Sequence, residues 1–144
     1  MFLFESLLVA MSTYSVIPVP QFEWNDRNMK YAICFFPAVG IFCGTALWGW
    51  SALADSLGIG GFFFAMIATC LPLLITGGIH MDGYMDTVDA LASHQSRERK
   101  LEILKDPNCG AFAVIYCGVY LLIYAGLIHE LFTANYILVI CPTF

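Results

Sequence analysis

Charged residues divide this chain into long apolar stretches. Lys, Arg, Asp and Glu are absent from residues 31–54, 56–81 and 107–129. A helix that crosses a bilayer needs about 20 mainly apolar residues, so each stretch is long enough. The pattern therefore predicts an all-α fold, a polytopic transmembrane helix bundle. We expect spans at about residues 31–54, 57–79 and 111–128, and a partial span at residues 131–144.

Two apolar segments near the ends of the sequence are shorter. Residues 2–17 are apolar apart from Glu5 and a cluster of Ser and Thr, and they fit an interfacial or re-entrant helix as well as a tight span. Pro18 and Pro20 end that segment, because proline lacks a donor and restricts the residue before it. Residues 131–144 are too few to cross a bilayer straight. We expect one membrane domain that is the N-terminal fragment of a longer protein.

The composition supports a membrane protein and argues against one class of partner. Hydrophobic residues make up 60% of the chain and charged residues 12%, against about 45–50% and about 25% in ordinary globular proteins. A bilayer accepts apolar surface that a soluble core of this size cannot bury. The net charge is −5 with only six Lys and Arg. Nucleic acid is therefore excluded as a partner, and membrane lipid is expected.

The basic residues predict how the chain lies in the membrane. They form two groups separated by two predicted spans, so both groups fall on one side. Cytoplasmic loops are enriched in Lys and Arg, so that side is predicted to be cytoplasmic. An acidic segment leads directly into the second group and is therefore expected at the cytoplasmic boundary. The basic residues are Arg27, Lys30, Arg97, Arg99, Lys100 and Lys105.

Three aspartates follow the second predicted span. Asp82, Asp86 and Asp89 have the spacing i, i+4, i+7, which places them within about 60° of one another on a helix. Like charges in this arrangement repel one another, and poor solvation near a membrane raises the cost. A divalent cation would relieve the repulsion, and Mg²⁺ prefers carboxylate and water ligands. The pattern favours a metal site, although a solvated helix face with three acids has the same spacing.

Each residue beside the aspartates fits either a catalytic or substrate-binding role or a purely structural one. Gly77 and Gly78 allow the backbone to approach another group closely. His80 fits a role in orienting phosphate or moving a proton, and equally a packing role at the interface. Asp106 fits a fourth metal ligand, and equally a cap for the helix that follows it. The basic segment 96–105 fits an amphipathic helix on anionic headgroups, or a source of cations for substrate phosphates.

Four stretches together resemble the cobalamin synthase family, the adenosylcobinamide-GDP ribazoletransferases. Residues 76–89 (TGGIHMDGYMDTVD) look like its acidic signature. Three further stretches agree in order and spacing, namely residues 17–20 (IPVP), 36–40 (FPAVG) and 97–106 (RERKLEILKD) followed by Gly110. The resemblance covers essentially the whole chain. Members of this family are longer, with more spans and a second glycine-aspartate motif, which is why we expect a fragment that holds part of the site.

The resemblance implies a multi-pass enzyme of the cell inner membrane that requires Mg²⁺. It would transfer the adenosylcobinamide phosphate group from adenosylcobinamide-GDP to α-ribazole or its 5′-phosphate, releasing GMP in the last step of nucleotide-loop assembly. Further partners would be membrane lipid, other copies of the chain or other corrinoid-pathway membrane proteins. The implied site residues are Asp82, Asp86 and Asp106 for catalysis, Gly77, Gly78, His80, Arg97 and Lys105 for substrate, and Asp82, Asp86 and Asp89 for Mg²⁺.

Two other functions compete with this one on the sequence. Acids at a membrane boundary often bind or relay ions, which is typical of a transporter or channel fragment. Against that reading, the acids follow the span, and the sequence indicates no pair of broken helices around a midplane site. A third interpretation is an inactive membrane fragment, which follows from the expected truncation and predicts no turnover.

Overall fold

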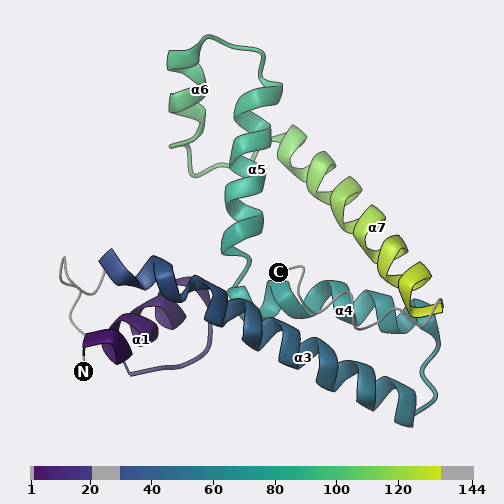
Figure 1. The fold of residues 1–144 in the computed structure, drawn as a ribbon. Coiled ribbons are helices and arrows are strands. Elements are labelled where there is room, and N and C mark those ends of the chain that lie inside the picture. The colour runs from purple at the N-terminus through teal and green to yellow at the C-terminus, as the bar shows by residue number, and fades with distance from the viewer. Residues whose placement is uncertain (1, 21–29, 134–144) are drawn as a thin grey trace.

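The computed structural model describes residues 2–20 and 30–133, which form helices joined by short turns (Figure 1). No strand occurs among these residues. The predicted all-α class is therefore confirmed. In chain order the elements are α1 (Phe2–Tyr14), the short 3-10 helix η1 (Ile33–Phe35), α3 (Phe36–Ser56), α4 (Gly61–Thr76), α5 (Ile79–Ala92), α6 (Arg97–Ile103) and α7 (Ala111–Thr133).

Among the described residues, two helices are long and apolar enough to cross a membrane. One is Lys30–Ser56, which includes η1 and α3, and the other is Ala111–Phe132 in α7. They lie close to the predicted spans 31–54 and 111–128. Large apolar side chains point outward from both, including Ile41, 66% exposed, and Leu122, 75% exposed. Helices that are apolar all round need an apolar surrounding, so the outward faces fit lipid.

The second predicted span, residues 57–79, differs in the structure. Helix α4 has 16 residues, which makes it about 24 Å long, shorter than the roughly 30 Å hydrocarbon core. After Thr76 the chain turns by 94° into α5, and the two helices together have the composition of one broken span. The described residues therefore contain one broken span that the charge pattern did not indicate, while the expected absence of a pair of broken helices around a midplane site stays a prediction. An uncharged stretch does not reveal the break, because hydropathy carries no information about direction.

Two glycines produce the turn between α4 and α5. Gly77 and Gly78 have φ of +64° and +75°, a left-handed conformation that glycine adopts without steric cost. Both N–H groups donate to the carbonyl of Leu73, and that of Gly78 does so at 2.9 Å. On the outer side, the N–H of Val16 donates to the carbonyl of Ile75 at 2.8 Å. The segment after α1 therefore holds the end of α4 in place.

Helix α7 closes α4 and α5 into a triangle (Figure 1). The 16 residues of α4 and the 14 of α5 form two sides of about 24 Å and about 21 Å at nearly a right angle. A third side of about 32 Å would join their far ends, and the 23 residues of α7 give about 34 Å. At its C-terminal end, the ring of Phe132 stacks on Phe64 of α4 with centroids 4.4 Å apart.

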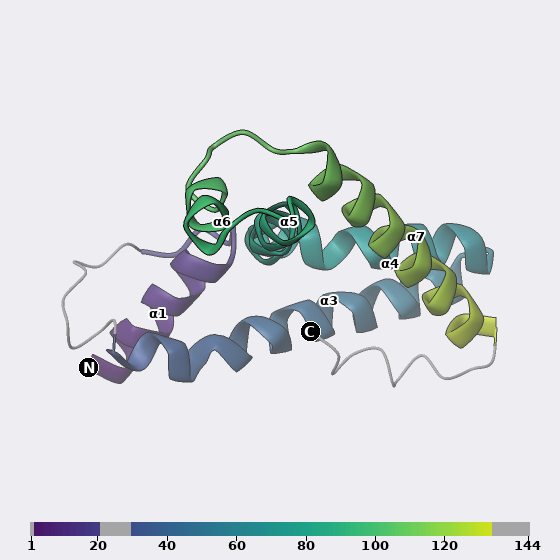
Figure 2. The ribbon, with the colours of Figure 1, turned by 90° about the horizontal axis from the view of Figure 1, so that it is seen from above.

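Helix α3 packs along α4 and supports the triangle, as the view from above shows (Figure 2). The turn between them places Gly58 at φ +63°, and Ile59 N–H donates to the Ala54 carbonyl at 2.9 Å. The indole of Trp50 donates to the carbonyl of Phe64 at 3.1 Å. The buried cluster of this base consists of Leu47, Ala54, Phe64, Ala65, Ala68 and Ile128. Helices α3 and α7 thus fix α4, from which α5 departs.

The end segments of the sequence are only partly described. Helix α1 has 13 residues, about 20 Å, which is shorter than a straight crossing and favours an interfacial or re-entrant position over a span. Helix α7 continues to Thr133. Most of the predicted partial span 131–144 lies outside the described residues.

Candidate active site

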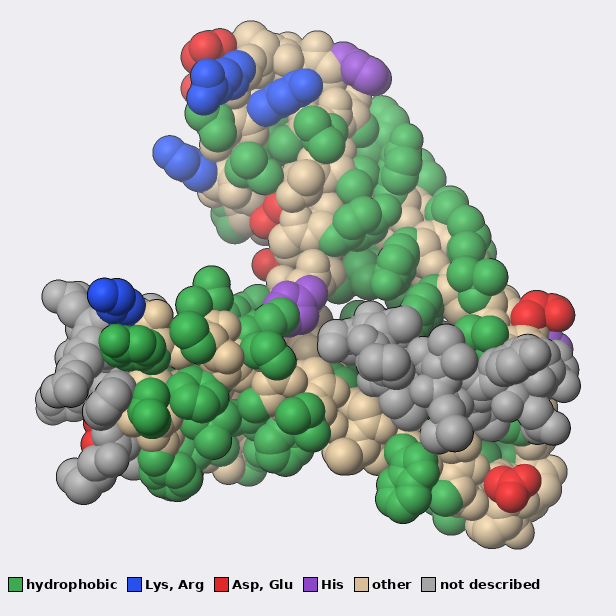
Figure 3. Space-filling view, in the orientation of Figure 1, with side chains coloured by type: hydrophobic (Ala, Val, Ile, Leu, Met, Phe, Trp, Pro, Cys, Tyr) green, Lys and Arg blue, Asp and Glu red, His purple; other side chains and the backbone are tan. Residues whose placement is uncertain are grey.

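The three aspartates lie on the single helix α5, as their spacing predicts. Asp82 is exposed, whereas Asp86 and Asp89 are half-buried. Figure 3 shows acidic side chains along α5 on the side from which α6 projects, with basic side chains gathered over α6. Within the described residues, Asp82 and Asp86 form no hydrogen bond or ion pair with another side chain. Both carboxylates are therefore available to a ligand.

Asp89 has a partner that its two neighbours lack. Its Oδ1 accepts a hydrogen bond from the N–H of Ala113 at 3.3 Å. The carbonyl of Gly110 accepts the bond from Val114, which makes Gly110 the N-cap of α7 and Ala113 its third helical residue. That N–H is ordinarily satisfied by the side chain of the N-cap residue itself. Asp89 supplies the missing side chain from another helix, and its negative charge suits the helix N-terminus.

Asp82 shares a cavity with the two glycines of the bend. The cavity holds about 550 Å³ and is lined by Asp82, Gly77 and Gly78, together with Met81 and Leu121. The structure thus brings together three of the predicted site residues. Because Gly77 and Gly78 carry no side chain, their backbone borders the same space as the Asp82 carboxylate.

The donor set fits a magnesium ion at a pair of aspartates better than at all three. Asp82 and Asp89 are about 10 Å apart along the helix axis, whereas oxygens on one Mg²⁺ lie within about 4 Å of each other. Among the described residues, no group of three or more His, Cys, Asp or Glu is arranged to hold a metal ion. Mg²⁺ is commonly held by one or two carboxylates plus substrate phosphates. Asp82 and Asp86, one turn apart, match that requirement.

His80 lies in an aromatic cluster at the start of α5. Its ring stacks on Tyr14 with centroids 6.2 Å apart and an interplanar angle of 17°. It also meets the edge of Phe36 at 5.2 Å. These contacts give His80 a packing role, and its ring borders a second cavity beside that of Asp82.

Asp106 occupies the turn after α6. Its Oδ1 accepts hydrogen bonds from the backbone N–H of Asn108 at 2.9 Å and from Nδ2 of the same residue at 2.7 Å. These bonds stabilise the ionised carboxylate and hold the pKa of Asp106 below its ordinary value. The predicted capping of α7 by Asp106 is replaced by Asp89. A carboxylate with a lowered pKa is also a weaker proton acceptor.

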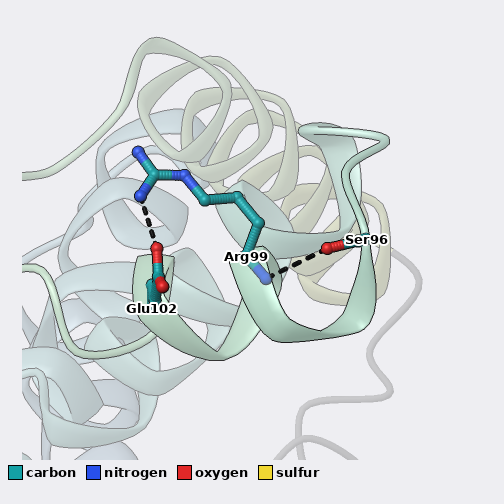
Figure 4. A network of polar contacts seen from close by, with 3 residues as sticks. All are labelled: Ser96, Arg99 and Glu102. Carbon is teal, nitrogen blue, oxygen red and sulfur yellow. Dashed lines mark hydrogen bonds and ion pairs between the residues drawn. The ribbon is translucent and has the colours of Figure 1, made fainter.

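Helix α6 carries the basic residues predicted to meet phosphate. Its N-cap is Ser96, whose hydroxyl oxygen accepts from the N–H of Arg99, and the Arg99 side chain pairs with Glu102 (Figure 4). In the part of the chain that the structure describes, Arg97 and Lys105 are exposed and pair with no acid. The helix packs on α5. No described contact joins these cations to Asp82 or Asp86.

Three tyrosines near the aspartates were missed by the sequence analysis. Tyr84 of α5 faces Tyr120 of α7 with ring centroids 5.7 Å apart, and Tyr120 stacks on Tyr124 at 5.8 Å. Tyr120 and Tyr124 are four residues apart in an apolar span, a spacing that places both on one helix face. That signal was present, but aromatic pairs in a span also occur as ordinary packing.

The fold is that of a membrane protein with long apolar helices, and its bent pair α4–α5 carries three aspartates on α5. The profile of the cobalamin-5-phosphate synthase family matches residues 6–144. The chain belongs to that family.

Several relatives bear the same functional name, adenosylcobinamide-GDP ribazoletransferase. The protein from Lachnoclostridium phytofermentans is 50% identical over 88% of this chain and 49% of its own length. The one from Clostridium botulinum strain Eklund 17B is 34% identical over 97% of this chain and 57% of its own length. The protein from Brevibacillus brevis is 37% identical over 88% of this chain and 51% of its own length. The chain thus spans about half the length of these curated relatives. No solved structure matches it.

Proposed function

We propose that this chain carries the acidic part of the active site of an adenosylcobinamide-GDP ribazoletransferase. The observation that supports this most is the cavity at the α4–α5 bend, where Asp82 borders Gly77 and Gly78. Asp86 follows one turn later on the same helix face. Family membership and the printed names of the relatives favour this reaction over the transporter alternative.

In the proposed reaction a ribose hydroxyl of α-ribazole attacks the phosphorus that bears adenosylcobinamide. A new P–O bond forms, the bridging P–O bond to GMP breaks, and GMP leaves with the bonding electrons. The hydroxyl proton passes to a carboxylate of the site or to water. Asp86, which has no partner among the described residues, is placed to accept it. The lowered pKa of Asp106 makes that residue the weaker candidate.

Asp82 and Asp86 would hold the magnesium ion of this reaction. Bound Mg²⁺ supplies charge stabilisation to the diphosphate oxygens and the leaving group. The chain's own contribution is positional: the glycine backbone leaves room for a diphosphate beside Asp82, and α5 is fixed by α4 and α7. Arg97 and Lys105, both exposed on the α6 side, would meet substrate phosphates that reach beyond the bend.

The membrane placement of the site is part of the proposal. The basic residues on and after α6 favour the cytoplasmic side of the inner membrane by the positive-inside rule. Acidic α5 is packed on α6, so it would face the same compartment. Soluble nucleotide substrates would then reach the carboxylates from the cytoplasm.

The proposal is tested by GMP release. The chain should be assayed alone and as a chimera in which it replaces the matching segment of the Lachnoclostridium relative, each in lipid nanodiscs with Mg²⁺, adenosylcobinamide-GDP and α-ribazole. We expect the chimera to release GMP, and Asp82→Asn or Asp86→Asn to abolish most of the release. Asp55→Asn is the matched control, because Asp55 is exposed at the far end of the α3–α4 hairpin.

Three outcomes would count against the proposal. An active chimera whose Asp82→Asn and Asp86→Asn variants keep the parent rate would place the chemistry elsewhere. A chimera that stays folded but releases no GMP would favour the inactive-fragment interpretation. Ion flux in liposomes without corrinoid would favour a transporter.

A further inference from the structure

A second cavity lies inside the triangle of α4, α5 and α7. Its volume is about 340 Å³, at the small end of the range for ligand pockets. Four elements contribute to it, because the 94° bend and the crossing of α7 hold their faces apart. Its aromatic lining consists of Phe36, His80, Tyr84, Tyr120 and Tyr124.

The aromatic rings of this cavity form two separate groups. On one side, Tyr84, Tyr120 and Tyr124 form a ladder with centroid spacings of 5.7 and 5.8 Å. On the other side, Phe36 and His80 meet edge to face at 5.2 Å. Flat aromatic molecules bind well among such rings, because stacked and edge-to-face contacts are both favourable. The arrangement therefore suits a planar ring system.

The surface of the cavity is mainly apolar, which restricts what such a ring can be. Its polar groups are the hydroxyls of two threonines and of the three tyrosines, and the imidazole of His80. The hydroxyls of Thr69 and Thr76 both donate to backbone carbonyls of α4, which leaves them only as acceptors. A base with many donor and acceptor edges, such as guanine, would lose hydrogen bonds to water here without full replacement. A mainly apolar bicyclic base, such as a benzimidazole, would lose few hydrogen bonds to water on entering the cavity.

The cavity adjoins the space that contains Asp82. Met81, Leu73 and Leu121 line both cavities, so the two cavities meet along these three side chains. Asp82 is the next residue after Met81 on α5. A planar base in the aromatic cavity would therefore place an attached sugar toward the Asp82 side.

We propose that the aromatic cavity binds the heteroaromatic base of the nucleoside acceptor, and that it selects an apolar bicyclic ring. This inference rests on the proposed function, since it assigns the acceptor half of the same site. It makes Tyr120, whose ring stands between Tyr84 and Tyr124, the central binding residue. The corrin macrocycle is too large for this cavity and would bind elsewhere.

The test is direct binding, without Mg²⁺, corrinoid or turnover. The chain in lipid nanodiscs is titrated with α-ribazole, and the dissociation constant is measured by equilibrium dialysis. We expect saturable binding that free 5,6-dimethylbenzimidazole displaces and GMP does not. Tyr120→Ala should weaken binding about tenfold or more, in keeping with base stacking on an aromatic ring. Tyr120→Phe keeps the ring and should bind within about twofold of the parent, since stacking dominates.

A matched control comes from the same helix. Tyr116→Ala removes a tyrosine one turn before Tyr120 that is 49% exposed and lies outside the cavity, so binding should not change. As a measurement independent of any variant, NMR cross-peaks are expected between the ring protons of α-ribazole and those of labelled tyrosines in the parent chain.

The proposal is overturned by any of four results. These are no binding above that of empty nanodiscs, equal effects of Tyr120→Ala and Tyr116→Ala, displacement by GMP as effective as by the benzimidazole, or no cross-peaks to tyrosine. Failure here is distinguishable from failure of the proposed function. An active chimera whose Tyr120→Ala variant retains the parent KM for α-ribazole would keep the reaction and reject this cavity.

Discussion

Asp89 and Gly110 meet where α5 joins α7, and each depends on the other. The Asp89 carboxylate takes the place of an N-cap side chain, and any Cβ at position 110 would overlap its oxygens. The same aspartate belongs to the acidic face predicted from sequence. Sequence spacing could not distinguish the role of Asp89 from the roles of Asp82 and Asp86. The hydrogen-bond partner of Asp89 is a backbone N–H 24 residues away.

The first residue-scale prediction concerns this junction. Asp89→Ala and Gly110→Ala should each lower the free energy of unfolding by about 1 kcal/mol, the usual value of an N-cap. The double variant should cost about as much as either single one, because both remove the same interaction. Gly118→Ala is the control, since space surrounds that glycine within α7 and alanine favours a helix interior. Denaturant titration in detergent measures all four. Additive losses would show that the two residues act independently.

A second prediction at this scale concerns pH. The Asn108 donors lower the pKa of Asp106, so their contribution is complete above the ordinary aspartate pKa and is lost as pH falls through the lowered value. An NMR titration of the Asp106 carboxyl carbon should show this lowered pKa. Asn108→Ala removes the side-chain donor and keeps the backbone N–H, so it should raise the pKa only part of the way to the ordinary value. Gln95→Ala, at an exposed position before α6, should leave the pKa unchanged. An ordinary pKa in the parent chain would mean that the turn does not form in solution.

At the scale of elements, the bend between α4 and α5 decides where the carboxylates lie. A continuous helix would carry Asp82 straight out of the membrane, whereas the bend sets α5 across the end of α4 at 94°. The position of the bend depends on Gly77, Gly78 and the contact with Val16. The site therefore depends on two residues that bear no functional group.

The two glycines should respond differently to substitution. Alanine at either position costs about 1–2 kcal/mol for the left-handed backbone. At Gly77 the new Cβ would also lie 2.7 Å from Cγ1 of Val16, whereas at Gly78 nothing lies within 4 Å. Gly77→Ala should thus lower the free energy of unfolding more than Gly78→Ala. Adding Val16→Ala should recover the difference. Equal losses at the two glycines, measured by the same titration, would contradict the packing of Val16 on the bend.

The sequence predicted elements better than it predicted their directions. Charge-free stretches located α3 and α7, because a span must exclude charge over its whole length. The i, i+4, i+7 spacing placed the aspartates on one helix because that relation is local. The broken span depends on Gly77 and Gly78 together with the distant contact of Val16. The capping of α7 by Asp89 and the tyrosine ladder depend wholly on contacts between distant helices. No local pattern encodes those contacts.

At the scale of the whole molecule, the triangle of α4, α5 and α7 places two cavities side by side within an apolar protein. One contains a carboxylate and glycine backbone, and the other is lined by aromatic rings. The proposed transfer of a diphosphate-activated group to a nucleoside would use both kinds of surface. The fold supplies them from helices that also hold one another in place.

The most direct test of the central claim is the Mg²⁺ dependence of GMP release by the chimera. We expect Asp86→Asn to lower the rate at full Mg²⁺ by at least about 100-fold, the upper end of what outer-shell partners alone contribute. We expect Asp89→Asn to leave the Mg²⁺ concentration for half-maximal rate unchanged, because the Asp89 carboxylate accepts a hydrogen bond from α7. A shift of that concentration in Asp89→Asn, with Asp86→Asn like the parent, would show that Asp89 and not Asp86 holds the metal ion.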